Sequence, residues 1–362
     1  MFLSIAIFLC LPFMLSTIAY SISREKLTKT AFKYEIIFIS LIFSFFMGLR
    51  YEVGIDYFAY YNTYTDFSLT NVTLNNFEPF FYWLYRFGHG MGFTSHFIFI
   101  VSSFVQSYFY LLAFKHHKNL LPYAILFLFF LMIFTYLNII RQCAAYSVIL
   151  VAYSNISRKK YWTGFCYIIL ASLFHRSSFV CFIVYGLLFK KCFFDKWEIQ
   201  CFIILIIMLF GNIAVDDIFD FLNSFISSFS NKRFSSVESE VNSGVGVLLK
   251  YVQYICILFL FRKKNTFYYI FNKRLFLIGC VIYGCFTYSM IMSRIALFFQ
   301  MSQLFLLPEL AYDFKKFWNI RNSLDKCFFL LLIFIILLLY IAPFFGYSSQ
   351  QCIPFKFNFG NI

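Results

Sequence analysis

Apolar runs recur from one end of this chain to the other, and they limit its fold more than any other feature. Of its 362 residues, 62% are hydrophobic and 13% are charged, whereas about a quarter of the residues in a soluble domain carry charge. Several runs are shorter than the roughly 20 residues of a straight membrane-spanning helix. We predict an all-α polytopic membrane protein with about 10–12 transmembrane helices, in a single integral membrane domain over residues 1–362. The runs lie near residues 2–20, 34–49, 94–114, 120–137, 139–157, 161–174, 177–189, 199–214, 246–261, 275–292, 295–312 and 327–345.

The basic residues follow a pattern along the chain. A net charge of +14 in a soluble protein suggests a nucleic-acid partner, but most of these cations lie between apolar runs, so we expect no nucleic acid. Of the 30 Lys and Arg residues, 21 fall in alternate connections. The positive-inside rule assigns these connections to the cytoplasm and places both termini outside. The 21 residues are Arg24, Lys26, Lys29, Lys33, Lys115, Lys118, Arg158, Lys159, Lys160, Lys190, Lys191, Lys196, Arg262, Lys263, Lys264, Lys273, Arg274, Lys315, Lys316, Arg321 and Lys326.

The same rule places two long polar loops outside, at about 50–93 and about 212–245. Arg141, the turn at 175–176 and Arg294 then fall at outer turns between apolar runs. Ionisable groups that reach into the membrane cost free energy unless something binds them. The pattern therefore predicts an anion site that faces outward.

The stretch from residue 48 to 61 is the most unusual part of the first outer loop. It places Arg50 and Asp56 beside a row of tyrosines, directly after an apolar run. A guanidinium clamps phosphate oxygens well, and a nearby carboxylate orients a sugar hydroxyl or takes its proton. Equally, Arg50 can snorkel to the interface and Asp56 can cap the helix that follows. The residues alone leave both interpretations open.

Arg141, His175 and Glu78 each admit two interpretations as well. An arginine near the bilayer centre generally faces a polar cavity or a partner, but at the interface its cost nearly vanishes. Histidine is a natural general base near neutral pH, although a lone histidine is more often a hydrogen-bonded turn residue. Glu78 is either a third candidate base or a carboxylate that the dipole favours at a helix N-terminus.

Several motifs are absent from the sequence. The eleven Cys residues are scattered without a CxxC pair, which favours small core hydrophobes over a metal site or a disulfide frame. There is no P-loop, no HExxH and no GxSxG, so soluble-type ATPases, zinc proteases and hydrolases have no support. No DxD-like acidic pair flanks the outer arginines, which argues against metal-dependent transfer from a nucleotide sugar. We expect neither a metal nor a cofactor.

Taken as a series, several short motifs resemble the EpsG-like family of exopolysaccharide and O-antigen polymerases, often called Wzy-type. Each motif is short, and their order along nearly the whole chain gives the resemblance its specificity. The matching residues are Gly48, Leu49, Arg50, Val53 to Tyr57, Tyr60, Glu78, Ile140, Arg141, Gln142, Ala144, Ala145, Phe174 to Ser178, Ser293, Arg294, Phe298, Phe299, Leu307, Pro308 and Ile353 to Lys356.

This resemblance implies a membrane glycosyltransferase of GT-C-like architecture in the bacterial plasma (inner) membrane, with its active site facing the periplasm or outside. It would transfer a growing glycan from polyprenyl pyrophosphate to a lipid-linked repeat unit, without a metal. Expected partners are polyprenyl-pyrophosphate-linked oligosaccharide repeat units, membrane lipid and a chain-length regulator. The alternatives are a lipid-linked oligosaccharide flippase or transporter, and a polysaccharide ligase.

The resemblance also implies roles for individual residues. Cationic side chains would stabilise the leaving pyrophosphate, and a carboxylate or imidazole would deprotonate or orient the acceptor hydroxyl. The pyrophosphate ligands would be Arg50, Arg141, Arg176 and Arg294, and the candidate catalytic bases are Asp56, Glu78 and His175. The sequence does not rank the three bases.

Overall fold

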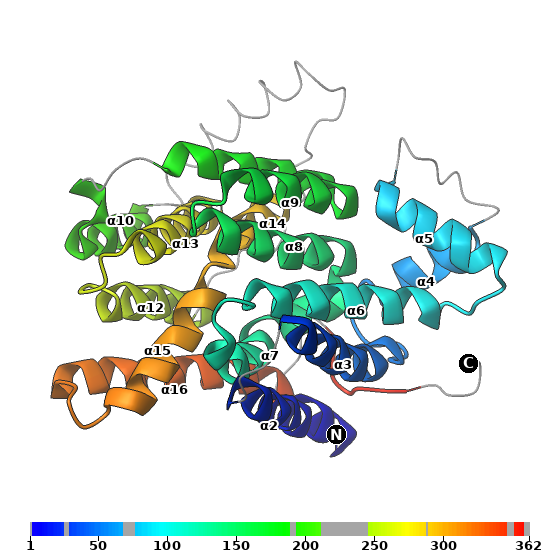
Figure 1. The fold of residues 1–362 in the computed structure, drawn as a ribbon, viewed down its shortest axis with the longest axis horizontal. Helices are drawn as coiled ribbons and strands as arrows, with labels where there is room; N and C mark the ends of the chain where they lie inside the picture. The colour runs from blue at the N-terminus through cyan, green and yellow to red at the C-terminus, as the bar shows by residue number, and fades with distance from the viewer. Residues whose placement is uncertain are drawn as a thin grey trace. The chain divides into compact units, whose positions relative to one another are not determined.

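The computed structural model describes residues 2–24, 29–67, 77–188, 193–210, 245–286, 289–345 and 351–357. Within these ranges the chain is built from helices (Figure 1), and the extended pairing consists of one isolated bridge between Arg50 and Phe357. The prediction of an all-α polytopic membrane protein is confirmed. Most of the predicted outer loop at 212–245, and residues 68–76 of the loop at 50–93, lie outside the described residues.

The chain divides into two compact units. The first comprises Met1–Phe182, Leu307–Trp318 and Ile336–Ile362, and the second comprises Ile183–Leu306 and Asn319–Ile335. The single membrane domain over residues 1–362 therefore stays a prediction, and each unit is described by itself.

The first unit is organised around a buried helix, α8. Nearly every residue of this helix is buried, because α6 packs on it from one direction and α9 from another. Further pairs pack α3 against α6 and α2 against α7. The helices of this unit are α1 (Phe2–Ile5), η1 (Ala6–Cys10), α2 (Leu11–Arg24), α3 (Lys29–Gly48), α4 (Tyr57–Thr65), α5 (Pro79–Gly90), α6 (His96–Ala113), η2 (Lys118–Leu120), α7 (Leu121–Asn138), α8 (Ile140–Ile156) and α9 (Tyr161–Phe174).

The second unit is a smaller bundle in which α13 packs against α14 and α10 packs against both α12 and α13. Its helices are η4 (Phe193–Asp195), α10 (Trp197–Phe210), α12 (Val245–Leu260), α13 (Phe267–Cys285) and α14 (Met290–Gln300). Three further elements have residues in both units: η3 (Arg176–Leu187), α15 (Gln303–Phe317) and α16 (Ser323–Phe345).

Five described helices are long and apolar enough to cross a membrane, and a sixth span results if the bent pair α14 and α15 counts as one. Four other apolar helices have 10–17 residues. At about 1.5 Å per residue these are shorter than the roughly 30 Å of a bilayer core. The predicted 10–12 transmembrane helices include such short elements, so that number stays a prediction.

Two predicted spans have different boundaries in the structure. The run at 275–292 becomes α13, which begins at Phe267, so Lys273 and Arg274 lie inside a helix and are buried instead of lying in a connection. The run at 295–312 is split into α14 and α15, which meet at 44°. Hydropathy alone therefore places the start of α13 too late in the sequence. Arg274 is tolerated inside the helix because the carboxylate of Asp195, from another element, pairs with it.

Candidate functional site

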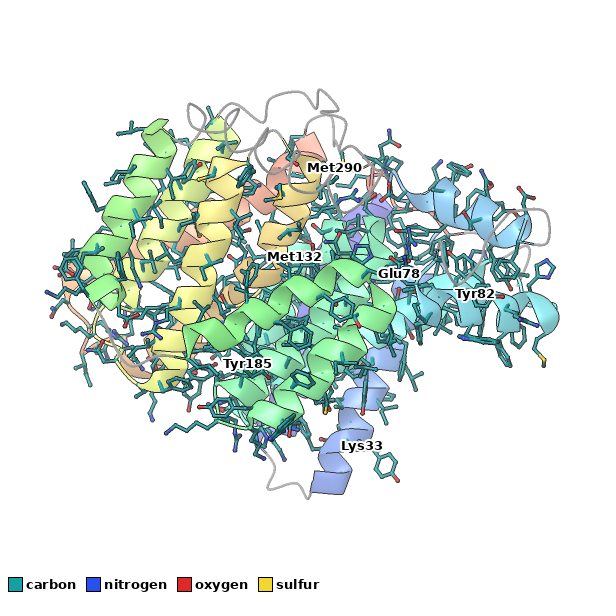
Figure 2. The ribbon with its side chains drawn as sticks, turned by 90° about the horizontal axis from the view of Figure 1, so that it is seen from above. Lys33, Glu78, Tyr82, Met132, Tyr185 and Met290 are labelled. Atoms are coloured by element: carbon teal, nitrogen blue, oxygen red, sulfur yellow. The ribbon has the colours of Figure 1, made fainter. Side chains whose placement is uncertain are left out.

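Glu78 is the centre of a cluster of ionisable side chains in the first unit. It precedes Pro79, the first residue of α5, and its extended backbone leads into that helix. Its side chain makes no capping bond, which leaves both carboxylate oxygens for other partners. Figure 2 shows Glu78 at the start of α5, with Tyr82 one turn further along.

Each oxygen of Glu78 contacts a different cationic or titratable side chain. Nη1 of Arg141 donates to Oε2 at 2.5 Å, and Nδ1 of His175 lies 2.7 Å from Oε1. The Glu78 side chain is 9% exposed, whereas Arg141 and His175 are 30% and 26% exposed. The carboxylate is therefore buried, whereas its two partners are accessible to solvent or to a substrate.

The ends of two helices place those partners. Arg141 is the second residue of α8 and lies in its first turn, two residues after Ile139, the single residue between α7 and α8. His175 ends α9, where its extended backbone turns the side chain away from the helix. Helix termini project side chains that the body of a packed helix would bury, which explains why both groups remain partly open.

Aromatic rings surround the Arg141 guanidinium. Its carbon lies 4.7 Å from the centre of the Phe77 ring and 5.9 Å from that of Tyr60. The guanidinium also interacts electrostatically with the Tyr60 hydroxyl. Cation–π contacts of this kind fix the plane of an arginine while leaving other N–H groups available.

The charges of the cluster determine where its protons lie. Burial raises the pKa of the Glu78 carboxyl, but the hydrogen bond to His175 and the charge of Arg141 outweigh burial and hold this pKa below its usual value. Glu78 is thus ionised at neutral pH, and its oxygens only accept hydrogen bonds. The proton between the two groups must then sit on Nδ1 of His175, so the neutral imidazole has its lone pair on Nε2.

Asp56 and Arg176 lie near this cluster. Asp56 occupies the N-cap position of α4 without a side-chain capping bond, and its charge acts on Tyr60. Burial and Asp56 raise the pKa of Tyr60, to about 12, against the opposing effect of Arg141. Arg176 is exposed and donates to the carbonyl of Phe77 at 3.4 Å, next to Glu78. The structure thus brings five of the seven predicted site residues to one region.

Arg50 is separate from the cluster. Its side chain is completely buried, and it donates to the carbonyls of Met47 and Leu137 at 2.7 and 3.1 Å. These carbonyls belong to the last turns of α3 and α7, where helical partners are missing. Its guanidinium also lies 4.6 Å from the centre of the Phe99 ring. Arg50 therefore caps two helices, and its predicted role as a pyrophosphate ligand stays a prediction.

A segment from the end of the chain closes over Arg50. The amides of Tyr51 and Gly54 donate to the carbonyls of Lys356 and Gln351, and Lys356 pairs with Glu52. Gly54 has a φ of +102°, and a Cβ there would lie 2.9 Å from Oδ1 of Asn138. The positive φ and the close approach of α7 both require glycine at this position. The sequence of the loop therefore fits its packing.

The seventh predicted residue, Arg294, belongs to the second unit. It lies in α14, and its predicted role as a pyrophosphate ligand stays a prediction.

Two aromatic contacts of the cluster were not assigned a role from sequence. Phe77 shields Arg141, and Tyr85, two turns after Glu78 on α5, has a buried hydroxyl without a hydrogen-bond partner. Neither residue carries a signal in the sequence, because aromatic residues occur throughout this chain and Glu78 precedes α5 with an extended backbone, so it shares no helical face with Tyr85.

Among the residues that the structure describes, no three His, Cys, Asp or Glu side chains gather as a metal site requires. The cluster has one carboxylate, one imidazole and two guanidinium groups. Such a set can accept a proton at Nε2 of His175 and bind an anion through the arginines. Independence of metal remains a prediction.

One comparison with known proteins identifies a family for this chain. The model of the EpsG family matches residues 33–357, a range that includes every residue of the cluster. No curated protein and no solved structure matches the chain. The matched range covers most of the sequence, and the family is one of membrane proteins of the polysaccharide-polymerase type. This chain is a member of the EpsG family.

Proposed function

We propose that this protein is a repeat-unit polymerase that lengthens an O-antigen or exopolysaccharide on the outer face of the bacterial plasma membrane. The donor is a growing glycan on polyprenyl pyrophosphate, and the acceptor is a lipid-linked repeat unit. The observation that carries the proposal is the contact of one buried carboxylate, Glu78, with both His175 and Arg141. Family membership supports the class of substrate.

In the proposed reaction His175 is the base. A hydroxyl oxygen of the acceptor attacks the anomeric carbon of the donor and forms the new glycosidic bond. The bond from that carbon to the pyrophosphate oxygen breaks, and its electron pair leaves with polyprenyl pyrophosphate. The hydroxyl proton passes to Nε2 of His175, while Glu78 holds Nδ1 and stabilises the imidazolium that forms. A single displacement of this kind inverts the anomeric centre.

The two arginines stabilise the leaving group. Negative charge grows on the pyrophosphate as the bond breaks, and preorganised donors aimed at that charge lower the barrier. Arg141 keeps its position through Glu78, Phe77 and Tyr60, so little reorganisation is needed. Arg176 is exposed on the same side of Glu78, where its contact with Phe77 holds it nearby.

His175 is favoured over the other two candidate bases. Glu78 is ionised, but both of its oxygens are already occupied, and its lowered pKa makes it a weak base. The link between Asp56 and the cluster is the effect of its charge on Tyr60. His175 has a nitrogen available and a carboxylate that orients it, as a general base needs.

The ladder of surface polysaccharide tests this function. Cells that lack the gene are complemented with wild type, His175→Gln or His89→Gln at matched membrane expression. His89 is an exposed histidine near the end of α5 and serves as the control. We expect single repeat units in the null strain and with His175→Gln, and a full ladder with His89→Gln. A normal ladder in the null strain would refute polymerase activity, and long chains that stay lipid-linked would indicate a ligase.

A further inference from the structure

Four basic residues lie at the end of α8 that is opposite the Glu78 cluster, and the proposed reaction does not use them. They follow α6 and α8 directly, in the connections where the chain leaves each helix. We call Lys115, Arg158, Lys159 and Lys160 the basic patch. Because α8 has 17 residues, its two ends are about 25 Å apart. The basic patch is therefore separate from the cluster.

Tertiary contacts bring the two connections together. Helices α6 and α8 pack against each other (Figure 1). The Ser154 hydroxyl, in the last turn of α8, donates to the carbonyl of Ala113, the last residue of α6, at 2.7 Å. Lys115 and Arg158 each follow two residues after the end of their helix. Their charges act on one another, because partial burial and then Lys160 and Arg158 lower the pKa of Lys115.

The histidine beside Lys115 adds no charge to the basic patch. Partial burial, followed by the charges of Arg158 and Lys115, lowers the pKa of His116 to about 4, so its imidazole is neutral at pH 7. Among the described residues, no member of the basic patch takes part in an ion pair. Glu309 acts on the following residue, His117. The basic patch thus gathers four positive charges that no described carboxylate neutralises by direct contact.

The backbone of the basic patch has an unusual conformation. Lys159 has a φ of +62°, in the left-handed region that favours glycine because a Cβ is strained there. Hydrogen bonds fix this turn, since the amides of Lys159 and Lys160 donate to the carbonyls of Ile156 and Asn155 at 2.8 and 3.0 Å. A lysine at a position where glycine is free of strain keeps one more charge in the basic patch.

Two aromatic residues follow the basic patch and indicate what it faces. Tyr161 and Trp162 begin α9 and are 39% and 81% exposed. Gly164 brings this turn close to α8, because a Cβ there would lie 2.3 Å from Cγ1 of Ile156. Tyrosine and tryptophan are enriched at the membrane–water boundary, where their rings lie at the level of the lipid headgroups. Exposed aromatic rings beside a basic surface therefore favour a headgroup as the ligand over an acidic soluble protein.

We propose that the basic patch binds the phosphate of an anionic phospholipid in the cytoplasmic leaflet. The positive-inside rule assigns both connections to the cytoplasm, and the anionic lipids of that leaflet attract basic segments at the membrane surface. The phosphate oxygens accept charge-assisted hydrogen bonds from the basic patch, and the Trp162 ring packs against the glycerol and the upper acyl chains. This site differs from the Glu78 cluster in its leaflet and its ligand, and it does not depend on the proposed reaction.

The test measures lipid binding by the full-length protein in detergent micelles. Wild type, Arg158→Gln/Lys160→Gln, Arg158→Lys/Lys160→Arg and Trp162→Ala are titrated with short-chain phosphatidylglycerol, with short-chain phosphatidylcholine and with glycerol phosphate. Native mass spectrometry counts the bound molecules. Arg86→Gln/Lys263→Gln removes the same number of charges from exposed positions elsewhere and is the matched control. The unfolding temperature of each variant checks the fold.

We expect wild type to prefer phosphatidylglycerol, and Arg158→Gln/Lys160→Gln to bind it about tenfold more weakly or worse, as the loss of charge-assisted hydrogen bonds predicts. Arg158→Lys/Lys160→Arg and the control should bind like wild type, and Trp162→Ala should weaken binding of the lipid.

Unchanged binding of phosphatidylglycerol in Arg158→Gln/Lys160→Gln, or equal binding of the two lipids by wild type, overturns the proposal. So does equal weakening in the control, which would reduce the effect to net charge. Glycerol phosphate that binds as tightly as phosphatidylglycerol would identify a soluble phosphate as the ligand and would overturn the lipid site as well.

Discussion

Two of the arginine–carboxylate pairs among the described residues, Arg274–Asp195 and Arg141–Glu78, have different surroundings. In the second unit, Nε and Nη2 of Arg274 donate to both oxygens of Asp195 at 2.8 and 2.7 Å, and Nη1 donates to the carbonyl of Leu187 at 2.6 Å. These two side chains are 6% and 2% exposed. In the first unit, Arg141 gives one N–H to Glu78 and remains 30% exposed.

The difference separates a structural pair from a candidate functional one. Arg274 directs each of its three nitrogens at an internal acceptor, and its side chain is almost completely buried, so a ligand has no access to it. Arg141 is held by a carboxylate that His175 shares, and its side chain remains partly exposed. Residue type is therefore a poor guide to the role of an arginine in this protein, and the number of donors used internally is a better one.

The strongest test of the comparison is Arg274→Ala. Removing one partner of a buried ion pair leaves an unpaired charge, here that of Asp195, and costs about 3–5 kcal/mol. We expect the variant to unfold at a much lower temperature, which fluorescence-detected size exclusion after heating measures. Lys263→Ala, an exposed cation of the same unit, is the control. Wild-type stability in Arg274→Ala would mean that this pair is not structural.

Arg141→Gln should show the opposite pattern. Loss of one preorganised donor to a developing anion lowers turnover about 10²–10³-fold, whereas a partly hydrated ion pair contributes little to stability. The rate of chain extension on purified lipid-linked units and the unfolding temperature are measured on the same preparation. Arg86→Gln, an exposed arginine of α5, should retain both. A large stability loss with full activity would place Arg141 in the same class as Arg274.

Arg50→Gln extends the comparison of Arg274 and Arg141 to a third arginine, which is completely buried. This substitution leaves the carbonyls of Met47 and Leu137 short of a charged donor in a buried site, which costs about 1–3 kcal/mol. We expect a lower unfolding temperature, and lower activity only in proportion to the folded fraction. If Arg50→Gln keeps its stability but loses affinity for undecaprenyl pyrophosphate, the original prediction of a pyrophosphate ligand is correct.

Much of the fold follows from hydropathy, and the roles of the arginines do not. The runs at 94–114, 120–137 and 327–345 correspond closely to α6, α7 and α16, because a long apolar stretch has few other ways to satisfy its backbone in a membrane. Nothing local marks the difference between Arg50 and Arg141. Arg50 caps Leu137, 87 residues away, and only the tertiary structure shows that both of its terminal nitrogens donate to internal carbonyls.

The candidate bases illustrate the same limit. Sequence identifies Asp56, Glu78 and His175 because each is a polar group between apolar or aromatic neighbours. Ranking them requires knowing that Glu78 contacts His175 through Nδ1 and leaves Nε2 available, which depends on the packing of α5 beside the end of α9.

The smallest expected effect concerns pH. The cluster holds the pKa of Glu78 below its ordinary value, so its contribution to stability is complete above the usual carboxyl range near pH 4.5 and is lost as pH falls through the lowered pKa. The difference in unfolding temperature between wild type and Glu78→Gln should be constant from pH 7 to 5 and shrink below. We expect it to correspond to about 1 kcal/mol, because both partners are partly hydrated. A difference that grows on acidification would contradict the ionised state of Glu78.

The segment that closes over Arg50 has a consequence for how the protein is made. Lys356 and Glu52 are 304 residues apart, and synthesis proceeds at about 5–20 residues per second. The amides of Tyr51 and Gly54 therefore wait about 15–60 s for their carbonyl partners, long after α3 has left the ribosome. During that interval water or an insertion factor must accept hydrogen bonds from these two amides. Pulse-chase proteolysis of nascent chains should find the loop after α3 accessible until residues 351–357 emerge.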